Sequence, residues 1–374
     1  MRLSAPTPIG TDARCPCIYP YSRRQNAPTM SSMRAAGTVR GCCTAPRSAA
    51  TPRLPRTGSP CSTPLSPLRA FAILACAYHF SFQTSFLGPR GLSLQAFSSM
   101  SCFTDREYLT TKQYRDDTNL NARIALHRRF STNPYPWFRW VFDQFDIAAP
   151  AQILELGCGP GDLWLENRDR IAPDWHVVLT DLSPGMLHRA RTRLRDIPHP
   201  FSFRRCDAQS LPFPSGSFDA VIANHMLYHV PDRSRAFAEI TRVLKADGCL
   251  YAALNGENHL QELAALIRRA APDLPIPVNA VQASGMTLEG AQDEFRHRFR
   301  QVTLREYLPN ALRVTEVEPL IAYIRSMVAA PFLTATHLDA LRTLIAHEIA
   351  AHGAFHITKS TGLYIACRPV SPSA

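Results

Sequence analysis

Acidic residues are almost absent from the first quarter of the chain. Residues 1–99 contain eleven arginines, no lysine and a single acid, Asp12, so this segment carries a net charge of +10. Residues 100–374 contain 30 basic and 29 acidic side chains and are nearly neutral. The overall charge of +11 therefore describes neither part, because the first segment is strongly basic and the second is nearly neutral.

The first 67 residues also lack apolar periodicity, because Pro, Ser, Thr, Ala and Arg dominate them. Such a segment buries too little apolar surface to offset its chain entropy. We predict a disordered basic extension over residues 1–99 and a folded domain over 100–374. The extension has three interpretations: an organelle transit peptide, an arm for nucleic acid, or sequence upstream of a later start at Met100. Its length and prolines disfavour the first, and its few aromatics disfavour the second.

No long uninterrupted apolar run occurs in the chain. The most apolar stretch, residues 68–88, is interrupted by Arg69, His79 and Gln83, whereas a membrane-spanning helix needs about 20 apolar residues. We therefore expect no membrane or nucleic-acid partner and a cytoplasmic location. There are two alternatives: residues 1–99 target the protein to an organelle, or they anchor it to a membrane.

Metal-binding patterns are missing as well. Cys15-Pro-Cys17 and Cys42-Cys43 lack zinc-ligand spacing and have no histidine partners nearby. The five cysteines from residue 100 onward are scattered, and three fall in or beside predicted buried strands. We predict that no metal is bound, and that these cysteines are free thiols in a reducing compartment.

Strand and helix patterns alternate through the middle of the chain. Near-continuous apolar runs predict strands at 152–156, 176–180, 201–205, 219–223 and 249–254. Ser183 followed by Pro184 predicts the start of a helix between the second and third strands. Repeated strand–helix pairs predict a parallel sheet covered on both faces, with ligands at the carboxyl ends of the strands.

A glycine-rich turn follows the first predicted strand. Residues 153–161 read Ile-Leu-Glu-Leu-Gly-Cys-Gly-Pro-Gly, and Asp181 follows twenty residues later at the end of the second strand. This pattern predicts an adenosyl-cofactor site, because glycine lets the backbone lie against the ligand and a carboxylate can accept from ribose hydroxyls. The third glycine comes one residue too early for a dinucleotide fingerprint. Glu155 suits a ligand with a cationic ammonium and sulfonium, so a dehydrogenase ranks last.

Four motifs resemble those of the class I S-adenosylmethionine-dependent methyltransferases, and among them the small-molecule group called type 11. The motifs lie at residues 154–161, 180–187, 206–221 and 242–248, in the family's order and at its spacing. They cover about 150–255, with looser similarity from 105 to 370. The resemblance implies a Rossmann-like doubly wound α/β sheet of seven strands, mostly parallel with the last strand antiparallel. It also implies N-terminal helices and a helical cap over about 258–352.

The resemblance further implies roles for individual residues. The glycines would lie against the methionine end of S-adenosyl-L-methionine, Asp181 would hold the ribose, and Leu182 would pack on the adenine. Residues expected at the cofactor are Glu155, Gly157, Gly159, Gly161, Asp181, Leu182, Asp207, Ala208 and Asn224. His229 is our candidate for a base near pH 7, although a histidine that only bonds the backbone is the favoured alternative. Arg123 could meet the cofactor carboxylate or lie on a surface helix.

These expectations combine into one functional hypothesis, which is methyl transfer to a small-molecule acceptor by in-line displacement. The chain has no Asn/Asp-Pro-Pro-Tyr run, which disfavours an amide or base nitrogen as acceptor. Two alternatives stay open: an RNA methyltransferase that uses the basic arm, and an S-adenosylmethionine-binding protein without catalysis.

Overall fold

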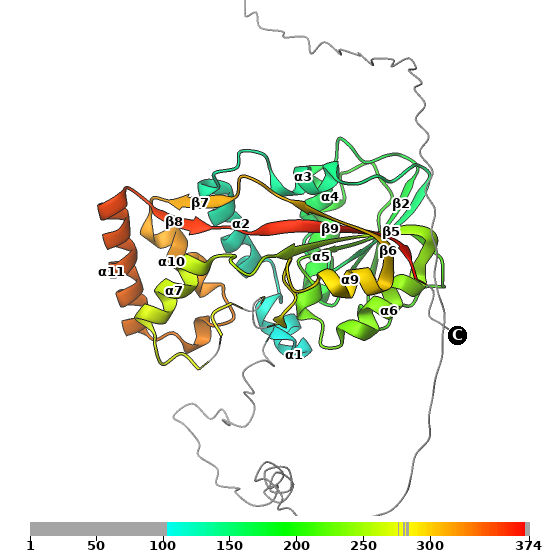
Figure 1. Ribbon diagram of the computed structural model, residues 1–374. Helices are drawn as coiled ribbons and strands as arrows, with labels where there is room; N and C mark the ends of the chain where they lie inside the picture. The colour runs from blue at the N-terminus through cyan, green and yellow to red at the C-terminus, as the bar shows by residue number, and fades with distance from the viewer. Residues whose placement is uncertain (1–102, 276, 280, 282–283, 371–374) are drawn as a thin grey trace, which may run out of the picture. The chain divides into compact units, whose positions relative to one another are not determined.

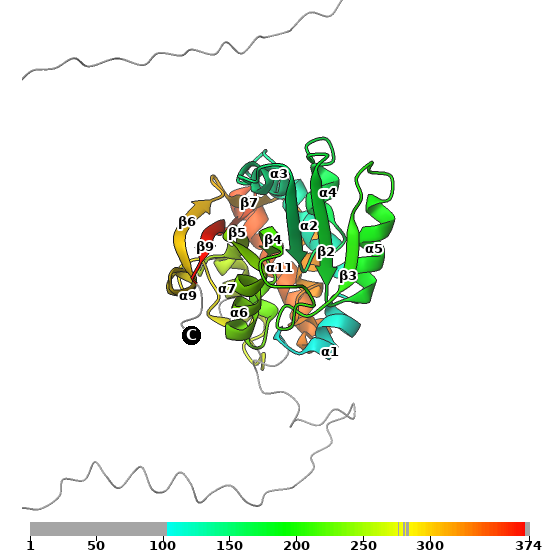
Figure 2. The same cartoon turned by 90° about the vertical axis from the view of Figure 1, so that its right-hand side faces the viewer.

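The computed structural model describes residues 103–275, 277–279, 281 and 284–370. The predicted extension over 1–99 and its apolar stretch at 68–88 lie outside the described residues. Seven strands form the main sheet in the order β3-β2-β1-β4-β5-β9-β6 (Figure 2). The strands are β1 Ala151–Leu156, β2 Trp175–Asp181, β3 Ser202–Arg205, β4 Phe218–Asn224, β5 Leu244–Asn255, β6 Phe299–Glu306 and β9 Thr361–Pro369.

The pairing of these strands confirms the predicted fold class. β1 pairs in parallel with both β2 and β4, and β4 continues in parallel to β5. The last strand, β9, runs antiparallel to both β5 and β6. The chain order reverses at β1, because β2 lies on one side of it and β4 on the other. In open parallel sheets the ligand crevice lies at such a point, beyond the carboxyl ends of the strands.

Helices cover both faces of the sheet (Figure 2). One face is covered by α3 Trp137–Asp143, α4 Asp162–Glu166 and α5 Pro184–Leu194, and the other by α6 Arg233–Val243 and α9 Gln292–Arg298. Helix α5 begins where the sequence predicts, because the Ser183 hydroxyl accepts from the Met186 amide and Pro184 occupies the first turn. Leu187 and Leu194 on its inner side are buried against β1 and β2.

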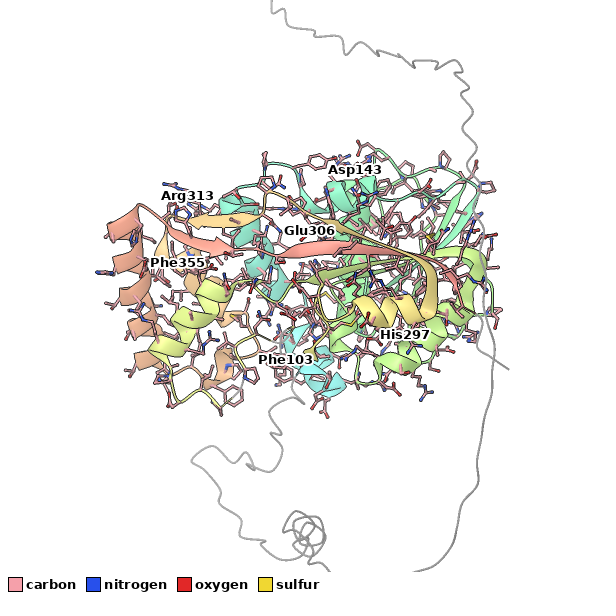
Figure 3. The ribbon with its side chains drawn as sticks, in the orientation of Figure 1. Phe103, Asp143, His297, Glu306, Arg313 and Phe355 are labelled. Carbon is pink, nitrogen blue, oxygen red and sulfur yellow. A yellow bond between two sulfur atoms is a disulfide. The ribbon has the colours of Figure 1, made fainter. Side chains whose placement is uncertain are left out.

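A second group of elements packs together at one end of the domain (Figure 1). It contains α2 Thr118–Phe130, α7 Gln261–Ala270, β7 Ala311–Val314, α10 Val317–Arg325, α11 Ala335–His352 and β8 Phe355–Thr358. Arg313 and Phe355, which come from the β7–β8 pair, lie at this end (Figure 3).

The predicted helical cap at 258–352 needs a correction. Strand β6 lies inside that range and belongs to the main sheet, as the strand pattern at 302–307 predicts. The unpredicted strands are β7 and β8, which pair in a separate two-stranded sheet. A strand of four residues gives little periodic signal in the sequence. β7 and β8 form strands only by pairing with each other, and α10 and α11 separate them in the sequence. The cap is therefore mixed helix and strand.

The cysteine prediction was wrong for one pair. Cys249 on β5 and Cys367 on β9 stand opposite each other in the antiparallel register and form a disulfide. They are 118 residues apart in sequence, so only the strand pairing brings them together. Cys158 and Cys206 are free, as predicted. The expectation of a reducing compartment rested on free cysteines, so the disulfide removes the argument for it.

Two absences concern the described part of the chain alone. None of its helices is both long enough and apolar enough to cross a bilayer. Within residues 103–275, 277–279, 281 and 284–370, no three His, Cys, Asp or Glu side chains gather in a way that could hold a metal ion.

Candidate active site

A cavity of about 850 Å³ lies at the carboxyl ends of β1, β2 and β4. It brings together nearly all of the residues predicted at the cofactor. Its wall includes Glu155, Gly157, Gly159, Asp181, Leu182, Asp207, Ala208 and Asn224, and also His229. Side chains from α2, from the segment before it, and from the turns after β5, β6 and β8 complete the wall.

The glycine turn has the backbone that its sequence predicts. Gly157 and Gly159 have φ values of +64° and +54°, in the left-handed region where a Cβ is strained. A Cβ on Gly157 would also lie 2.9 Å from the Cβ of Met226, whereas one on Gly159 would meet only Leu120, at 3.8 Å. Both glycines thus leave the backbone bare where it forms the cavity wall.

Gly161 requires a correction. Its φ is +82°, but it is not among the residues that line the cavity. A Cβ on it would lie 2.9 Å from Cδ1 of Leu194, so this glycine lets the start of α4 pack closely on α5. Its place in the motif reflects packing between two helices.

Asp181 joins the second strand to the glycine turn. Its Oδ2 accepts from the Gly159 amide at 2.9 Å, and its Oδ1 accepts from the Ser183 amide at 2.8 Å. Burial raises the pKa of Asp181 to about 6. The carboxylate therefore shapes the turn as well as facing the cavity, and a mutation here acts on both.

Glu155 is a buried carboxyl group without a cationic partner in the described residues. Trp164 Nε1 donates to its Oε2 at 2.6 Å, and burial raises its pKa to about 8. Asn224 lies beside Glu155 and lowers that pKa, but neither of its buried amide atoms forms a hydrogen bond of normal geometry. Unpaired polar atoms and an uncompensated carboxyl group at one wall fit a ligand with a positive charge and hydrogen-bonding groups.

The segment before α2 lies over this end of the cavity. It comprises α1 Arg106–Tyr108 and the π-helix η4 Leu109–Gln113. Arg106 forms an ion pair with Asp207, whose Oδ1 also accepts from the Gln209 amide at 3.0 Å. The Ser183 hydroxyl donates to the Tyr114 carbonyl at 2.7 Å. The N-terminal segment thus contacts the turns after both β2 and β3.

His229 lies on the 3-10 helix η5 Leu227–His229 after β4, and both of its ring nitrogens have partners. Nδ1 lies 2.9 Å from the Phe103 carbonyl, and Nε2 lies 3.0 Å from the Tyr114 hydroxyl. Because a carbonyl only accepts, these contacts assign the proton to Nδ1 and make Nε2 the acceptor from Tyr114. Burial lowers the pKa of His229 to about 4, so the ring is neutral at pH 7. The backbone contact agrees with the favoured alternative from the sequence, and the role as a base stays a prediction.

The far wall of the cavity contains His225, which we expect on the acceptor side after the fourth strand, and also Trp137, Tyr307 and Lys359, which the sequence did not single out. Trp137 on α3 stacks on Trp140 and makes an edge contact with Tyr307. Lys359, between β8 and β9, places its Nζ 5.7 Å from the centroid of the Tyr307 ring. His225 has a φ of +52°, which is rare for a residue other than glycine and is typical of functional positions.

The contacts of Arg123 on α2 contradict the interpretation that it lies on a surface helix. Its Nε donates to the Ser326 hydroxyl at 3.2 Å and its Nη2 to the Ser326 carbonyl at 2.5 Å. It lines the cavity, and its Nη1 lies 3.4 Å from the Tyr114 hydroxyl. No sequence pattern could have predicted this contact, because Ser326 lies 203 residues further along the chain.

The seven-stranded sheet with one antiparallel strand, the glycine turn and the carboxylate on the neighbouring strand define the domain as one of the methyltransferase class of adenosyl-cofactor proteins. Residues 154–252 match the family model described as a methyltransferase domain. This part of the chain belongs to the class I S-adenosylmethionine-dependent methyltransferases.

Known proteins similar to the chain carry related names. It is 35% identical over 114 residues to the ubiquinone/menaquinone biosynthesis C-methyltransferase UbiE of Xanthomonas oryzae. The aligned residues cover 30% of this chain and 45% of that protein. The chain is equally similar, with the same coverage, to the demethylmenaquinone methyltransferase of Symbiobacterium thermophilum. The chain thus spans about half the length of these relatives. A crystal structure of a putative methyltransferase from Bacillus halodurans aligns with 63% of this chain and 99% of its own, at 16% identity and a TM-score of 0.44.

Proposed function

We propose that the protein transfers the methyl group of S-adenosyl-L-methionine to a small-molecule acceptor. The observation that carries the proposal is the single cavity in which the glycine turn, Glu155 and Asp181 face a wall of aromatic and basic side chains. Such a cavity can hold a cofactor at one end and an acceptor at the other. Its volume lies within the range of small-molecule sites.

The bound cofactor supplies a methyl group that its positively charged sulfur already activates. The chain's own residues then have three tasks: to bind, to align and to exclude water. Asp181 and Asp207 offer carboxylates to hydroxyl and amine donors, while Glu155, whose pKa burial raises to about 8, offers a carboxyl group that a bound positive charge would ionise. Tyr114 and Leu109, from the segment before α2, close one side of the cavity against solvent.

The acceptor's proton, where it has one to lose, has a path through two side chains. Tyr114 donates its hydroxyl proton to Nε2 of His229, so the Tyr114 oxygen can take a proton from an acceptor as it passes its own to the histidine. The Phe103 carbonyl stabilises the resulting positive charge through Nδ1. General base catalysis of this kind contributes roughly a hundredfold to ten-thousandfold.

A cytoplasmic location belongs to the same proposal, since a small-molecule enzyme of this kind needs a supply of its cofactor. In that reducing compartment Cys249 and Cys367 would be thiols, and their disulfide would form under oxidising conditions. Fluorescent fusions of the full chain and of residues 100–374 test it. Different distributions of the two fusions would assign targeting to residues 1–99 and contradict the proposed location.

Titration calorimetry with S-adenosylmethionine tests the site assignment. We expect micromolar binding to the full chain and a loss of roughly 10- to 100-fold in Asp181→Ala, because hydrogen bonds to a charged group contribute about 1.5–3 kcal/mol. Asp339→Ala is the matched control, since Asp339 is an exposed residue of α11 paired with Arg342. Undiminished binding in Asp181→Ala would discard the assignment.

An acceptor screen tests the transfer itself. The full chain and labelled S-adenosylmethionine are incubated with small acceptors, including the demethylmenaquinone named for one relative, and formation of S-adenosylhomocysteine is measured. Activity that disappears in Asp181→Ala supports methyl transfer. Cofactor binding without turnover across the whole screen favours the binding protein without catalysis.

A further inference from the structure

The cavity has two chemically different ends. Four of the five acids that line it belong to the glycine turn and the ends of the strands, at Glu155, Asp162, Asp181 and Asp207, and the fifth, Glu166 on α4, is paired with Arg128. Basic side chains from four separate segments line the other end: Arg123 and His127 on α2, His225 after β4, His259 after β5, and Lys359 between β8 and β9. We call these five residues the basic wall.

Arg123 and Lys359, the two strongest bases of the basic wall, have only neutral partners, and burial lowers the pKa of Lys359 to about 8. Arg123 donates to Ser326 and to the Tyr114 hydroxyl, neither of which carries a charge. The Nζ of Lys359 lies over the Tyr307 ring, and Lys359 takes part in no ion pair formed by the described residues. A charge held against the apolar lining of a cavity is costly unless an opposite charge or hydrogen bonds compensate it.

The histidines of the basic wall have unused hydrogen-bonding atoms. Nδ1 of His127 and Nδ1 of His225 are buried without a hydrogen-bond partner in the described residues. Trp137 Nε1, on the same cavity wall, is also buried without a partner. Buried polar atoms are nearly always paired in folded proteins, so three unpaired atoms beside this wall fit an acceptor that brings hydrogen-bonding groups of its own.

The electrostatics of the wall agree with this geometry. Burial lowers the pKa of His225 to about 4 and that of His259 to about 3, and the charge of Lys359 contributes to both shifts. No acid contributes to the pKa of His127, His225 or His259, whereas Lys359 contributes to all three. The rings are therefore neutral donors or acceptors around one positive charge.

We propose that the methyl acceptor carries an anionic group, a carboxylate or a phosphate, which Lys359 binds at the basic wall with His127 and His225 as hydrogen-bonding neighbours. The proposal rests on the proposed function, since it concerns the acceptor end of the same cavity. Trp137 and Tyr307 offer flat apolar surface to the rest of the acceptor. A cationic acceptor in an aromatic cage is disfavoured, because Lys359 already faces Tyr307. A neutral acceptor would leave Lys359 uncompensated.

Matched aromatic probes test the charge of the acceptor. The full chain is first saturated with S-adenosylhomocysteine, whose binding is measured separately and reports on the cofactor site. Benzoate, phenyl phosphate, benzyl alcohol and benzylamine are then titrated by calorimetry. We expect the better of the two anions to bind at least tenfold more tightly than the alcohol and the amine. The ranking of benzoate and phenyl phosphate distinguishes a carboxylate from a phosphate.

Lysine variants assign the site. Lys359→Met should weaken the better anion about tenfold and leave S-adenosylhomocysteine binding unchanged, while Lys359→Arg retains most of the anion affinity. Lys112→Met is the matched control, because Lys112 is exposed on η4 and does not line the cavity. If Lys359→Met does not fold, the ranking of probes on the unmodified chain decides.

Three results would overturn the proposal: equal or tighter binding of the alcohol or the amine, no binding of either anion, or an anion affinity that Lys359→Met leaves unchanged. Failure of S-adenosylhomocysteine to bind would instead contradict the proposed function. In that case the anion titrations without it still test the basic wall.

Discussion

Tyr114 Oη lies 3.0 Å from Nε2 of His229, and this contact joins the N-terminal segment to the turn after β4. The same ring is held from its other side by the Phe103 carbonyl, which lies near α1 (Figure 3). One histidine therefore contacts two points of a segment that covers the cavity. The contact can hold the segment in place, pass a proton, or do both.

Variants of His229 and Tyr114 separate these roles. His229→Asn retains a donor close to the position of Nδ1 and loses the acceptor for Tyr114, whereas His229→Gln retains an acceptor close to the position of Nε2. If the pair passes a proton, Tyr114→Phe and His229→Asn lower kcat about a hundredfold or more and leave cofactor affinity within a few-fold. The measurement is turnover with an acceptor from the screen, beside calorimetry with S-adenosylmethionine. Equal losses of cofactor affinity and of turnover would show that the pair is a structural contact and passes no proton.

Gly185 controls how closely the N-terminal segment approaches the domain. A Cβ on this glycine, in the first turn of α5, would overlap the Arg115 carbonyl oxygen. Gly185→Ala should therefore displace the segment, because a backbone atom cannot move aside as a side chain can. We expect faster trypsin cleavage at Lys112 and Arg115 and weaker cofactor binding. Gly216→Ala is the control, because its positive φ costs stability while nothing lies within 4 Å of its Cβ. Equal cleavage of both variants would contradict the prediction.

The parts of the structure that the sequence predicted depend on local signals. The glycine turn, the Ser183 cap and the apolar strands each lie within a few adjacent residues, and each was found at its predicted place. The basic wall and the Cys249–Cys367 disulfide depend on residues far apart in sequence, which only the finished strand order brings together. Gly161 shows a further limit, since its place in the motif also serves the packing of α4 on α5, which no local pattern reveals.

Because of the disulfide, we predict that the stability of the folded chain depends on the oxidation of Cys249 and Cys367. Cys249 and Cys367 close a loop of 118 residues, and a cross-link of that size stabilises a folded chain by about 4–5 kcal/mol in the chain-entropy model. Excess dithiothreitol should lower the thermal midpoint on the order of 10 °C. The double variant Cys249→Ser, Cys367→Ser should show the lower midpoint without reductant and no further change with it. Peptide mapping that finds both thiols alkylated in the untreated protein would contradict the bond.

Glu155 predicts a loss of stability between pH 6.5 and 8. Its pKa rises from 4.5 to about 8 on folding, so within this window the folded state holds a proton that the unfolded state has released. The free energy of unfolding therefore falls as pH rises, by about 1.4 kcal/mol per pH unit and about 2 kcal/mol over the window. The raised pKa of Asp181, about 6, acts in the same direction but only below the window.

Other shifted groups also act inside this window. His225, His229 and His259 have folded pKa values of about 3 to 4 and an ordinary value of 6.5, so the unfolded chain still releases their protons up to about pH 7.5. Their effect raises the free energy of unfolding there and opposes that of Glu155. Lys359, with a pKa of about 8, acts mainly above the window. The contribution of Glu155 is therefore measured as a difference between two proteins. From pH 6.5 to 8, the free energy of urea unfolding of the unmodified chain should fall by about 2 kcal/mol relative to that of Glu155→Gln, which keeps an acceptor for Trp164. Glu306→Gln, an exposed residue at the end of β6, is the control. Equal changes in the unmodified chain and in Glu155→Gln would show that Glu155 does not carry the raised pKa.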